Sequence, residues 1–177
     1  MRSLFYLVLL GVILLTLAIV VRSGILASKH PEEPINSAMR ASMAETSPQL
    51  STEDATRIRA AFPTAYTTKS GLMYVNRDPG AVGPSPRIGD TIVANYAGRL
   101  LDGTPFDSSY NHGAPLRVQI GVGQVIKGWD EAFLTMKKGA RRTLIIPYWL
   151  GYGEAGRPPT IPPRATLVFD VELVDFH

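Results

Sequence analysis

The chain has 177 residues, enough for one modest domain with appendages, and 45% of them are hydrophobic, which is ordinary for a globular protein. It contains no cysteine, which excludes disulfides and thiolate metal sites within the chain. Its formal charge of +3 at pH 7 is only mildly basic, and no aromatic platform or recognition motif accompanies the basic residues, so we expect no nucleic-acid partner.

The N-terminus is the most apolar part of the chain. Residues 3–21 carry no charge and are mostly Leu, Val and Ile. As a helix with a rise of about 1.5 Å per residue, this segment would span about 28 Å, close to the hydrocarbon core of a bilayer. It therefore predicts a transmembrane signal anchor over residues 1–22. A signal peptide cleaved after Ala27 is the alternative, although secretory apolar cores usually run to about 7–15 residues.

Residues 23–63 are predicted to be a flexible tether that ends in a short helix. Prolines and small polar residues are scattered through its first half, a composition with no core of its own. A capping pattern begins at Ser51, and Ile58 and Phe62 follow at helical spacing. We expect a three-turn helix over about residues 52–62 that leans on the domain that follows.

Strands dominate the rest of the chain, residues 64–177. Alternating apolar residues and turn signals predict five strands, at about residues 72–76, 91–101, 115–121, 141–146 and 165–174. Between the third and the fourth, apolar residues recur at helical spacing from Trp129, which predicts one amphipathic helix that begins there and that Gly139 closes. The fold class is therefore α+β, with an antiparallel sheet of about five strands wrapped on one short helix.

The sequence contains no pattern for nucleophilic or metal catalysis. It has no Gly-x-Ser-x-Gly, no metal-ligand spacing and no glycine-rich phosphate loop, so we expect no cofactor and no metal. Instead, large apolar residues are concentrated in predicted loops, namely Phe106, Tyr110, Tyr148, Trp149, Tyr152 and Ile161. Loops lie on the surface, so these residues predict a concave apolar pocket.

Four blocks of sequence, taken together and in this order, resemble the FKBP-type peptidyl-prolyl cis-trans isomerases over about residues 71–176. The blocks are Asn95–Gly98, Asp102–Ser109, Gln124–Asp130 and Tyr148–Leu173. The resemblance implies the FKBP-like fold and an enzyme that accelerates X-Pro rotation in client proteins outside the cytoplasm. A catalytically weak proline-binding or chaperone module on the same fold is the alternative.

The resemblance also implies the site. Its catalytic residues would be Tyr96, Phe106, Asp107, Trp129, Tyr152 and Phe169, and its substrate contacts Leu116, Val125, Ile126 and Ile161. Trp129 looks like the floor under the proline ring, and Asp107 like the carboxylate near the substrate carbonyl. The Ile126 N–H and the Tyr152 hydroxyl resemble donors to substrate carbonyls.

Ordinary structural roles compete with these assignments. Tyr96 and Phe169 alternate within predicted strands, and Trp129 lies on an apolar helix face, so all three could be core residues. The sequence also departs from the family. Val118 and its neighbour at position 116 are aliphatic where phenylalanines are common, and residues 156–160 are proline-rich where many relatives have glycines.

The expected partners are proline-containing segments of client proteins and, through the N-terminal helix, the membrane. The protein is expected to be a monomer and a membrane-anchored bacterial form of the family. We expect the domain to face the periplasm from the inner membrane, or to be released into the periplasm if the N-terminal segment is cleaved.

Overall fold

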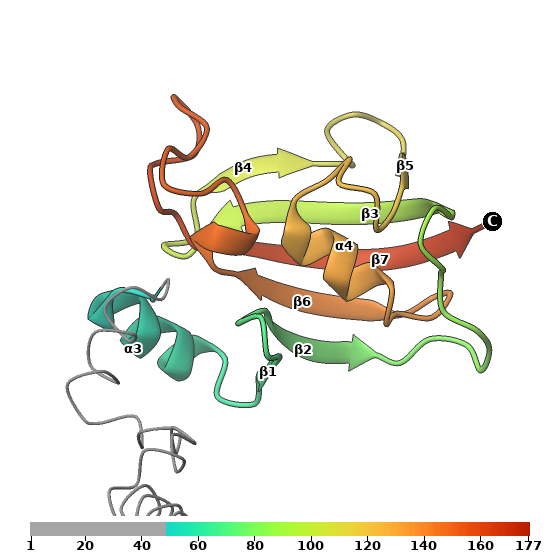
Figure 1. The fold of residues 1–177 in the computed structure, drawn as a ribbon, viewed down its shortest axis with the longest axis horizontal. Helices are drawn as coiled ribbons and strands as arrows, with labels where there is room; N and C mark the ends of the chain where they lie inside the picture. The colour runs from blue at the N-terminus through green and yellow to red at the C-terminus, as the bar shows by residue number, and fades with distance from the viewer. Residues whose placement is uncertain (1–48) are drawn as a thin grey trace, which may run out of the picture. The chain divides into compact units, whose positions relative to one another are not determined.

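The computed structural model describes residues 49–177, which fall within one compact unit (Figure 1). The transmembrane segment predicted over residues 1–22 and most of the predicted tether lie outside the described residues. Within residues 49–177, no helix is long and apolar enough to cross a membrane.

A seven-stranded antiparallel sheet frames the domain. Its strand order is β1-β2-β6-β7-β3-β4, and β5 also pairs with β3. The strands are β1 (Tyr66–Thr67), β2 (Met73–Asp78), β3 (Thr91–Leu100), β4 (Pro105–Ser108), β5 (Leu116–Gln119), β6 (Arg141–Ile146) and β7 (Leu167–Phe176). The five predicted strands are present, but the predicted number is too low because β1 and β4 are too short to carry a readable alternation.

The two longest strands, β3 and β7, lie next to each other. They pair from Ile92 opposite Phe176 to Leu100 opposite Leu167. Along β7, Leu167, Phe169, Val171 and Leu173 are buried, while Asp170 between them is exposed. Side chains alternate between the two faces of a strand, so the predicted period-two pattern of this strand is confirmed.

Helix α4 (Lys127–Phe133) lies against one face of the sheet, which we call the inner face (Figure 1). The helix was predicted, but its bounds were wrong. It begins at Lys127, so Trp129 is inside its first turn, and it ends at Phe133. Thr135 donates both its N–H and its hydroxyl to the Ala132 carbonyl, at 3.2 and 2.9 Å, which tightens the chain into a turn. Gly139 has a left-handed φ of 78°, but it lies in the turn before β6 and not at the helix end.

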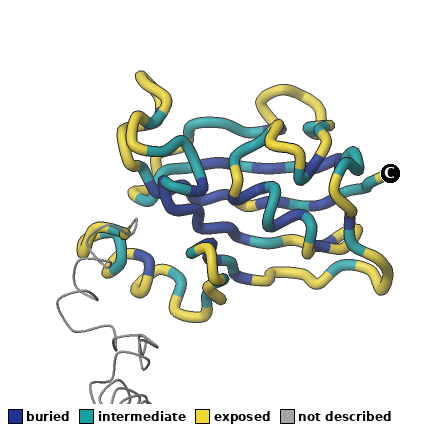
Figure 2. Tube along the Cα trace, in the orientation of Figure 1, coloured by how far each residue is buried: buried dark blue, intermediate teal, exposed yellow. Residues whose placement is uncertain are grey.

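The main core lies between α4 and the inner face. Figure 2 shows that buried residues follow one another along the central strands and recur in the helix. Gly128 permits this close packing, because a Cβ at that position would lie 2.7 Å from the Ile146 side chain. The helix therefore rests directly on β6, and its first turn is held at a fixed height above the sheet.

Helix α3 (Thr52–Ala61) covers part of the opposite, outer face. The Ser51 hydroxyl accepts the Asp54 N–H at 3.0 Å, which confirms the predicted cap. Ile58 is buried with Met73 and Ile145, and the Thr166 hydroxyl donates to the Asp54 carboxylate at 2.7 Å. The prediction that this helix leans on the domain is confirmed.

Candidate active site

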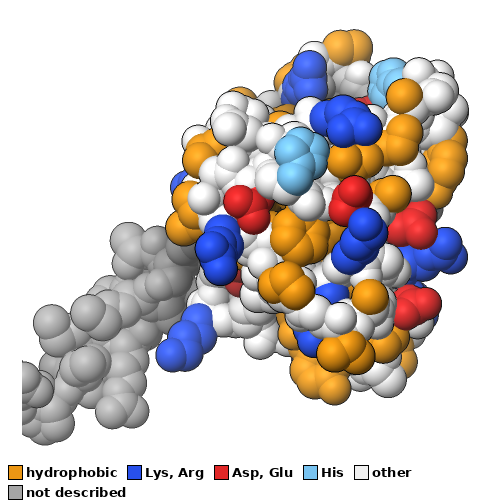
Figure 3. Space-filling model, turned by 90° about the vertical axis from the view of Figure 1, so that its right-hand side faces the viewer, with side chains coloured by type: hydrophobic (Ala, Val, Ile, Leu, Met, Phe, Trp, Pro, Cys, Tyr) orange, Lys and Arg blue, Asp and Glu red, His pale blue; other side chains and the backbone are white. Residues whose placement is uncertain are grey.

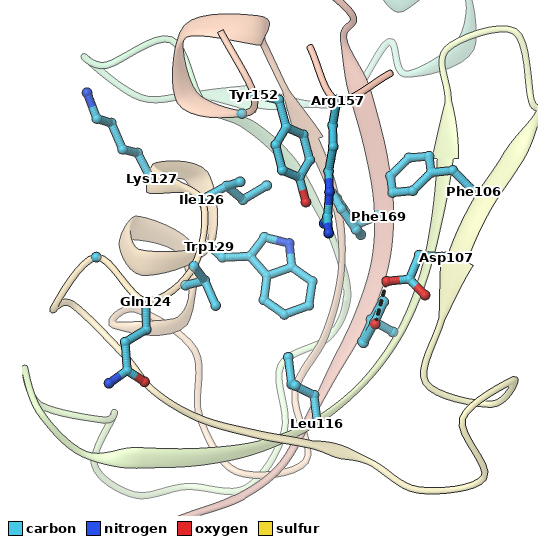
Figure 4. A pocket seen from close by; sticks show the side chains of 14 residues that line it. Phe106, Asp107, Leu116, Gln124, Ile126, Lys127, Trp129, Tyr152, Arg157 and Phe169 are labelled. Atoms are coloured by element: carbon cyan, nitrogen blue, oxygen red, sulfur yellow. Dashed lines mark hydrogen bonds between the residues drawn. The ribbon is translucent and has the colours of Figure 1, made fainter. Parts of the chain in front are cut away.

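A cavity of about 560 Å³ opens between α4, β3, β4 and β7 (Figure 4). Nine of the ten predicted site residues line it, namely Tyr96, Phe106, Asp107, Leu116, Val125, Ile126, Trp129, Tyr152 and Phe169. The sequence analysis did not select its remaining lining residues, which are Gly123, Gln124, Lys127, Gly151 and Arg157. Segments far apart in the chain therefore converge on one hollow, as predicted. Of the six loop residues from which the pocket was predicted, however, only Phe106 and Tyr152 line it.

Ile161 is the exception among the predicted residues. It is only 3% exposed, packs in the main core and does not line the cavity. Its N–H donates to the Arg157 carbonyl at 3.0 Å, and the Arg157 N–H donates to its carbonyl at 2.8 Å. Because burial in the core is favourable for an aliphatic side chain and not for a guanidinium, this turn places Ile161 in the core and leaves Arg157 at the cavity.

The floor of the cavity is a cluster of aromatic rings around Trp129. The Trp129 ring is 5.1 Å from that of Tyr96, 5.2 Å from that of Phe169 and 5.3 Å from that of Phe133, centroid to centroid. All three contacts are edge-to-face, the geometry that aromatic quadrupoles favour. The rings hold one another in place, so the floor has a fixed shape before any ligand enters.

A glycine near the end of β3 allows the side wall of the cavity to close. The Phe106 and Phe169 rings meet edge-to-face at 5.3 Å, directly over Gly98. A Cβ on Gly98 would lie 2.7 Å from the Phe169 ring and 2.8 Å from the Phe106 ring. The glycine in the Asn95–Gly98 block therefore has a physical reason, since any side chain there would displace two cavity residues.

One wall is polar and internally hydrogen-bonded. The Tyr96 hydroxyl donates to one oxygen of Asp107 at 2.8 Å, drawn as a dashed line in Figure 4. The other oxygen accepts the Ser108 N–H at 2.8 Å and lies 2.8 Å from His112 Nε2. Partial burial opposes ionisation of Asp107, but the bonds from His112, Tyr96 and Ser108 outweigh it and hold the pKa of this carboxyl below its usual value.

The surroundings of Tyr96 in the same wall keep its hydroxyl protonated. Burial, reinforced by the neighbouring Asp107 carboxylate, raises the pKa of the Tyr96 hydroxyl well above its usual value. Tyr96 therefore remains a hydrogen-bond donor throughout the physiological range. Asp107 remains ionised there, with its charge directed toward the cavity.

His112 was missed as a member of this wall, because a histidine in a loop carries no pattern of its own. The only sequence signal was its position five residues after Asp107, in a loop short enough to turn back.

Asp130 was missed as well. Its carboxylate accepts the Gly121 N–H at 2.7 Å and the Gly123 N–H at 2.9 Å, which shapes the loop that carries Val125 and Ile126 to the cavity.

The facing wall offers donors without protein acceptors. Tyr152 follows the 3-10 helix η1 (Tyr148–Leu150), and its hydroxyl points into the space above Trp129 (Figure 4). Within residues 49–177 this hydroxyl has no hydrogen-bond partner. Ile126 is the N-terminal cap residue of α4, which has no side-chain cap bond. Within the described residues, the N–H groups of Ile126, Lys127 and Gly128 have no acceptor, whereas the Trp129 N–H donates to the Ile126 carbonyl at 2.9 Å. The polar groups of the Asp107 wall are thus hydrogen-bonded to one another, whereas the donors of the facing wall have no acceptor within residues 49–177 and can bind a ligand.

Comparison with known proteins agrees with the fold and the cavity. The profile of the FKBP-type peptidyl-prolyl cis-trans isomerases matches residues 83–174, which is about half of the chain. The chain therefore belongs to this family. It is also similar to the solved structure titled "Crystal structure of AtFKBP13", with a TM-score of 0.61 and 41% identity, covering 64% of this chain and 98% of that one.

Curated relatives come from plants and bacteria alike. Peptidyl-prolyl cis-trans isomerase FKBP15-2 of Arabidopsis thaliana is 57% identical over 86 residues, which are 49% of this chain and 53% of that protein. The FK506-binding protein of Neisseria meningitidis serogroup C is 55% identical over 89 residues, which are 50% of this chain and 82% of that protein. The chain thus spans about half the length of the Arabidopsis relative.

Proposed function

We propose that this chain is a peptidyl-prolyl cis-trans isomerase that accelerates rotation about X-Pro bonds in client proteins. The observation that carries the proposal is the cavity itself. A rigid aromatic floor at Trp129 lies between the bonded Tyr96–Asp107 pair on one side and the unpartnered Tyr152 hydroxyl on the other. Family membership supports the same activity.

The chemistry requires no nucleophile. Amide resonance gives the peptide bond a rotational barrier of about 18–20 kcal/mol. At the twisted geometry that resonance is lost and the carbonyl becomes less polar. Water stabilises the polar planar form more than the twisted form, so an apolar cavity that fits the twisted form lowers the barrier. Each factor of ten in rate needs only about 1.4 kcal/mol of such preference.

Each part of this mechanism can be assigned to residues that line the cavity. The proline ring would lie on Trp129, whose position the surrounding rings fix. The Asp107 carboxylate would face the rotating carbonyl group, held in orientation by Tyr96. The Tyr152 hydroxyl and the Ile126 N–H would donate to the carbonyls on either side and hold the peptide while its central bond turns.

The Trp129 indole gives a further argument for a binding role. Its Nε1 is buried and has no acceptor within the part of the chain that the structure describes. An orphaned buried donor costs about 1–3 kcal/mol, which phenylalanine in the same place would avoid. A purely structural role would therefore favour a different residue, whereas a broad flat floor for a proline ring favours tryptophan.

A catalytically weak proline-binding module is the competing function, and one pair of variants separates the two. Asp107→Asn removes the carboxylate charge at the cavity, and Asp170→Asn is the matched control on the outer face of β7. Exchange spectroscopy on a proline peptide should show at least about a tenfold lower rate for Asp107→Asn and a nearly unchanged rate for Asp170→Asn. Binding of the peptide without any acceleration by the unaltered chain would favour the binding module.

We further propose that the domain is held at a bacterial inner membrane by residues 3–21 and faces the periplasm as a monomer. The uncharged length of the segment supports the anchor. Protease added to spheroplasts should degrade a chain that stays with carbonate-washed membranes. A shorter soluble periplasmic species would show cleavage instead, and complete protection of the membrane-bound chain would reverse the orientation.

A further inference from the structure

Two cations at the cavity lack an acidic partner. Arg157 and Lys127 both line the cavity, and neither forms an ion pair with any residue in 49–177. Four arginines elsewhere in the described residues do form such pairs, namely Arg57–Glu53, Arg99–Asp170, Arg141–Glu172 and Arg164–Glu154. The cavity therefore carries positive charge that no ion pair within residues 49–177 neutralises.

The structure holds Arg157 in place at the cavity. Its two backbone hydrogen bonds to Ile161 fix the Cα, and its guanidinium lies 5.9 Å from the Tyr152 ring centroid, within the range of a cation–π contact. Figure 4 shows this side chain extended toward the space above Trp129, while Lys127 points away from it. Of the two cations, Arg157 is the one directed at a bound peptide.

The cavity's own carboxylate does not neutralise Arg157. Both oxygens of Asp107 are already engaged, by Tyr96, Ser108 and His112, and Arg157 forms no ion pair with it. Figure 3 shows charges of both signs mixed with hydrophobic side chains on one face of the molecule, without a large patch of either sign. On this face, Arg157 is therefore not part of a larger patch of like charge.

We propose that the cavity prefers an Asp or Glu immediately before the proline over the uncharged residue of the same size, with Arg157 as the specificity-determining residue. This rests on the proposed isomerase function. A guanidinium presents several N–H donors in a fork that matches a carboxylate. Because Arg157 is exposed, the preference should be about twofold to fivefold, the range that exposed ion pairs usually provide.

The preference should appear in KM more than in kcat. The carboxylate of the preceding residue lies outside the bond that rotates, so its contact with Arg157 is the same in the planar and twisted forms. An interaction of equal strength in both states tightens binding without lowering the barrier. Salt should weaken it, since screening acts on exposed charges.

The test uses the full chain in a non-ionic detergent and three peptides capped at both ends, acetyl-Ala-Xaa-Pro-Phe-amide with Xaa as Glu, Gln or Leu. The readout is the ratio of kcat/KM for Glu over Gln, which does not depend on the absolute rate. We expect a ratio of about twofold to fivefold at low salt. It should approach one at about 0.5 M sodium chloride, where the Debye length is about 4 Å, and in Arg157→Gln at any salt. Arg59→Gln, which removes one exposed cation from α3, is the control and should keep the ratio.

The outcomes separate this inference from the function on which it rests. If the protein does not raise the rate of X-Pro isomerisation in any of the three peptides, the proposed isomerase function is wrong. If the Leu peptide is accelerated but the Glu to Gln ratio is one, the isomerase stands and the acidic preference is refuted. A ratio that persists in Arg157→Gln and disappears in Lys127→Gln would overturn the assignment to Arg157.

Discussion

Strands β6 and β7 present different residues to the two faces of the sheet. On the inner face, Leu144, Phe169 and Val171 pack beneath α4 in the main core, and Phe169 also lines the cavity. On the outer face, the same strands place Thr143 and Asp170 in a polar ladder. Side-chain alternation thus gives one pair of strands a core with a binding site on one side and a hydrogen-bonded surface on the other.

The polar ladder of the outer face consists of two hydrogen-bonded groups. The Thr143 hydroxyl donates to Asp170 at 2.7 Å and accepts from Arg77 Nε at 3.0 Å. Farther along, Glu172 accepts from Arg141 at 2.9 Å and from the Asn95 amide at 3.1 Å. None of these residues lines the cavity. On the inner face, the same residues therefore stabilise the core and line the cavity, whereas on the outer face the residues that stabilise the fold lie away from the cavity.

The largest effect should follow from a residue that serves both core and cavity. Phe169→Ala removes a ring that contacts Phe106, Trp129 and Tyr96. Loss of buried area and the cavity left behind should lower the free energy of unfolding by about 3–5 kcal/mol, and the isomerase rate should fall as well. Denaturant titration alongside the peptide assay measures both. A stable variant would show that the inner face tolerates a hole beneath the site.

The outer face offers the matching test at Ile58. Ile58→Ala empties the contact of α3 with Met73 and Ile145 and should lower the free energy of unfolding by about 2–4 kcal/mol. Because this cluster lies across the sheet from the cavity, kcat/KM measured well below the melting temperature should be unchanged. A parallel loss of activity would show that the two faces are coupled through β6, and would contradict the separation proposed here.

The regular part of the fold could be predicted from local patterns. The capping signal at Ser51 predicted α3 to within one residue, and alternation in residues 167–173 predicted β7 to within two residues at each end. The short strand β4 could not be found this way, because its pairing with β3 depends on contacts between chain segments. The end of α4 was missed for a different, local reason, because the hydrogen bonds from Thr135 to Ala132 turn the chain although the apolar residues continue at helical spacing.

The site was predictable only where several motifs combined. Tyr96, Trp129 and Phe169 each fit a core residue equally well, and the structure shows them to be both core and cavity lining. Ile161 was placed at the cavity by resemblance, yet its burial puts it in the core. Arg157 carries no pattern at all, and only the folded turn reveals that it reaches the cavity.

A smaller effect is expected from the polar ladder. Glu172→Gln removes the charge opposite Arg141 and weakens the bond to Asn95. Partly exposed ion pairs usually contribute less than about 1 kcal/mol, so the free energy of unfolding should fall by no more than that, and the difference should shrink in high salt. Denaturant titrations at low and high salt measure it. A loss comparable with that of Ile58→Ala would mean that the outer face depends on charge rather than on α3.

The smallest effect concerns the pH dependence of the Asp107 wall. The pKa of Asp107 is lower in the folded chain than its usual value, because its hydrogen bonds outweigh partial burial. A depressed folded pKa means that ionised Asp107 stabilises the fold at pH values above its unfolded pKa of about 3.9, and that this contribution is lost as the pH falls through the lower folded value. His112→Ala removes one of the bonds that lower this pKa, so the carboxyl should titrate at a higher pH and the isomerase rate should decline earlier on acidification. A carbon NMR titration of the Asp107 carboxyl follows the shift directly, with His177→Ala as the control histidine outside the cavity. If both variants titrate like the unaltered chain, Tyr96 and Ser108 alone hold the carboxylate, and His112 is not part of the wall's electrostatics.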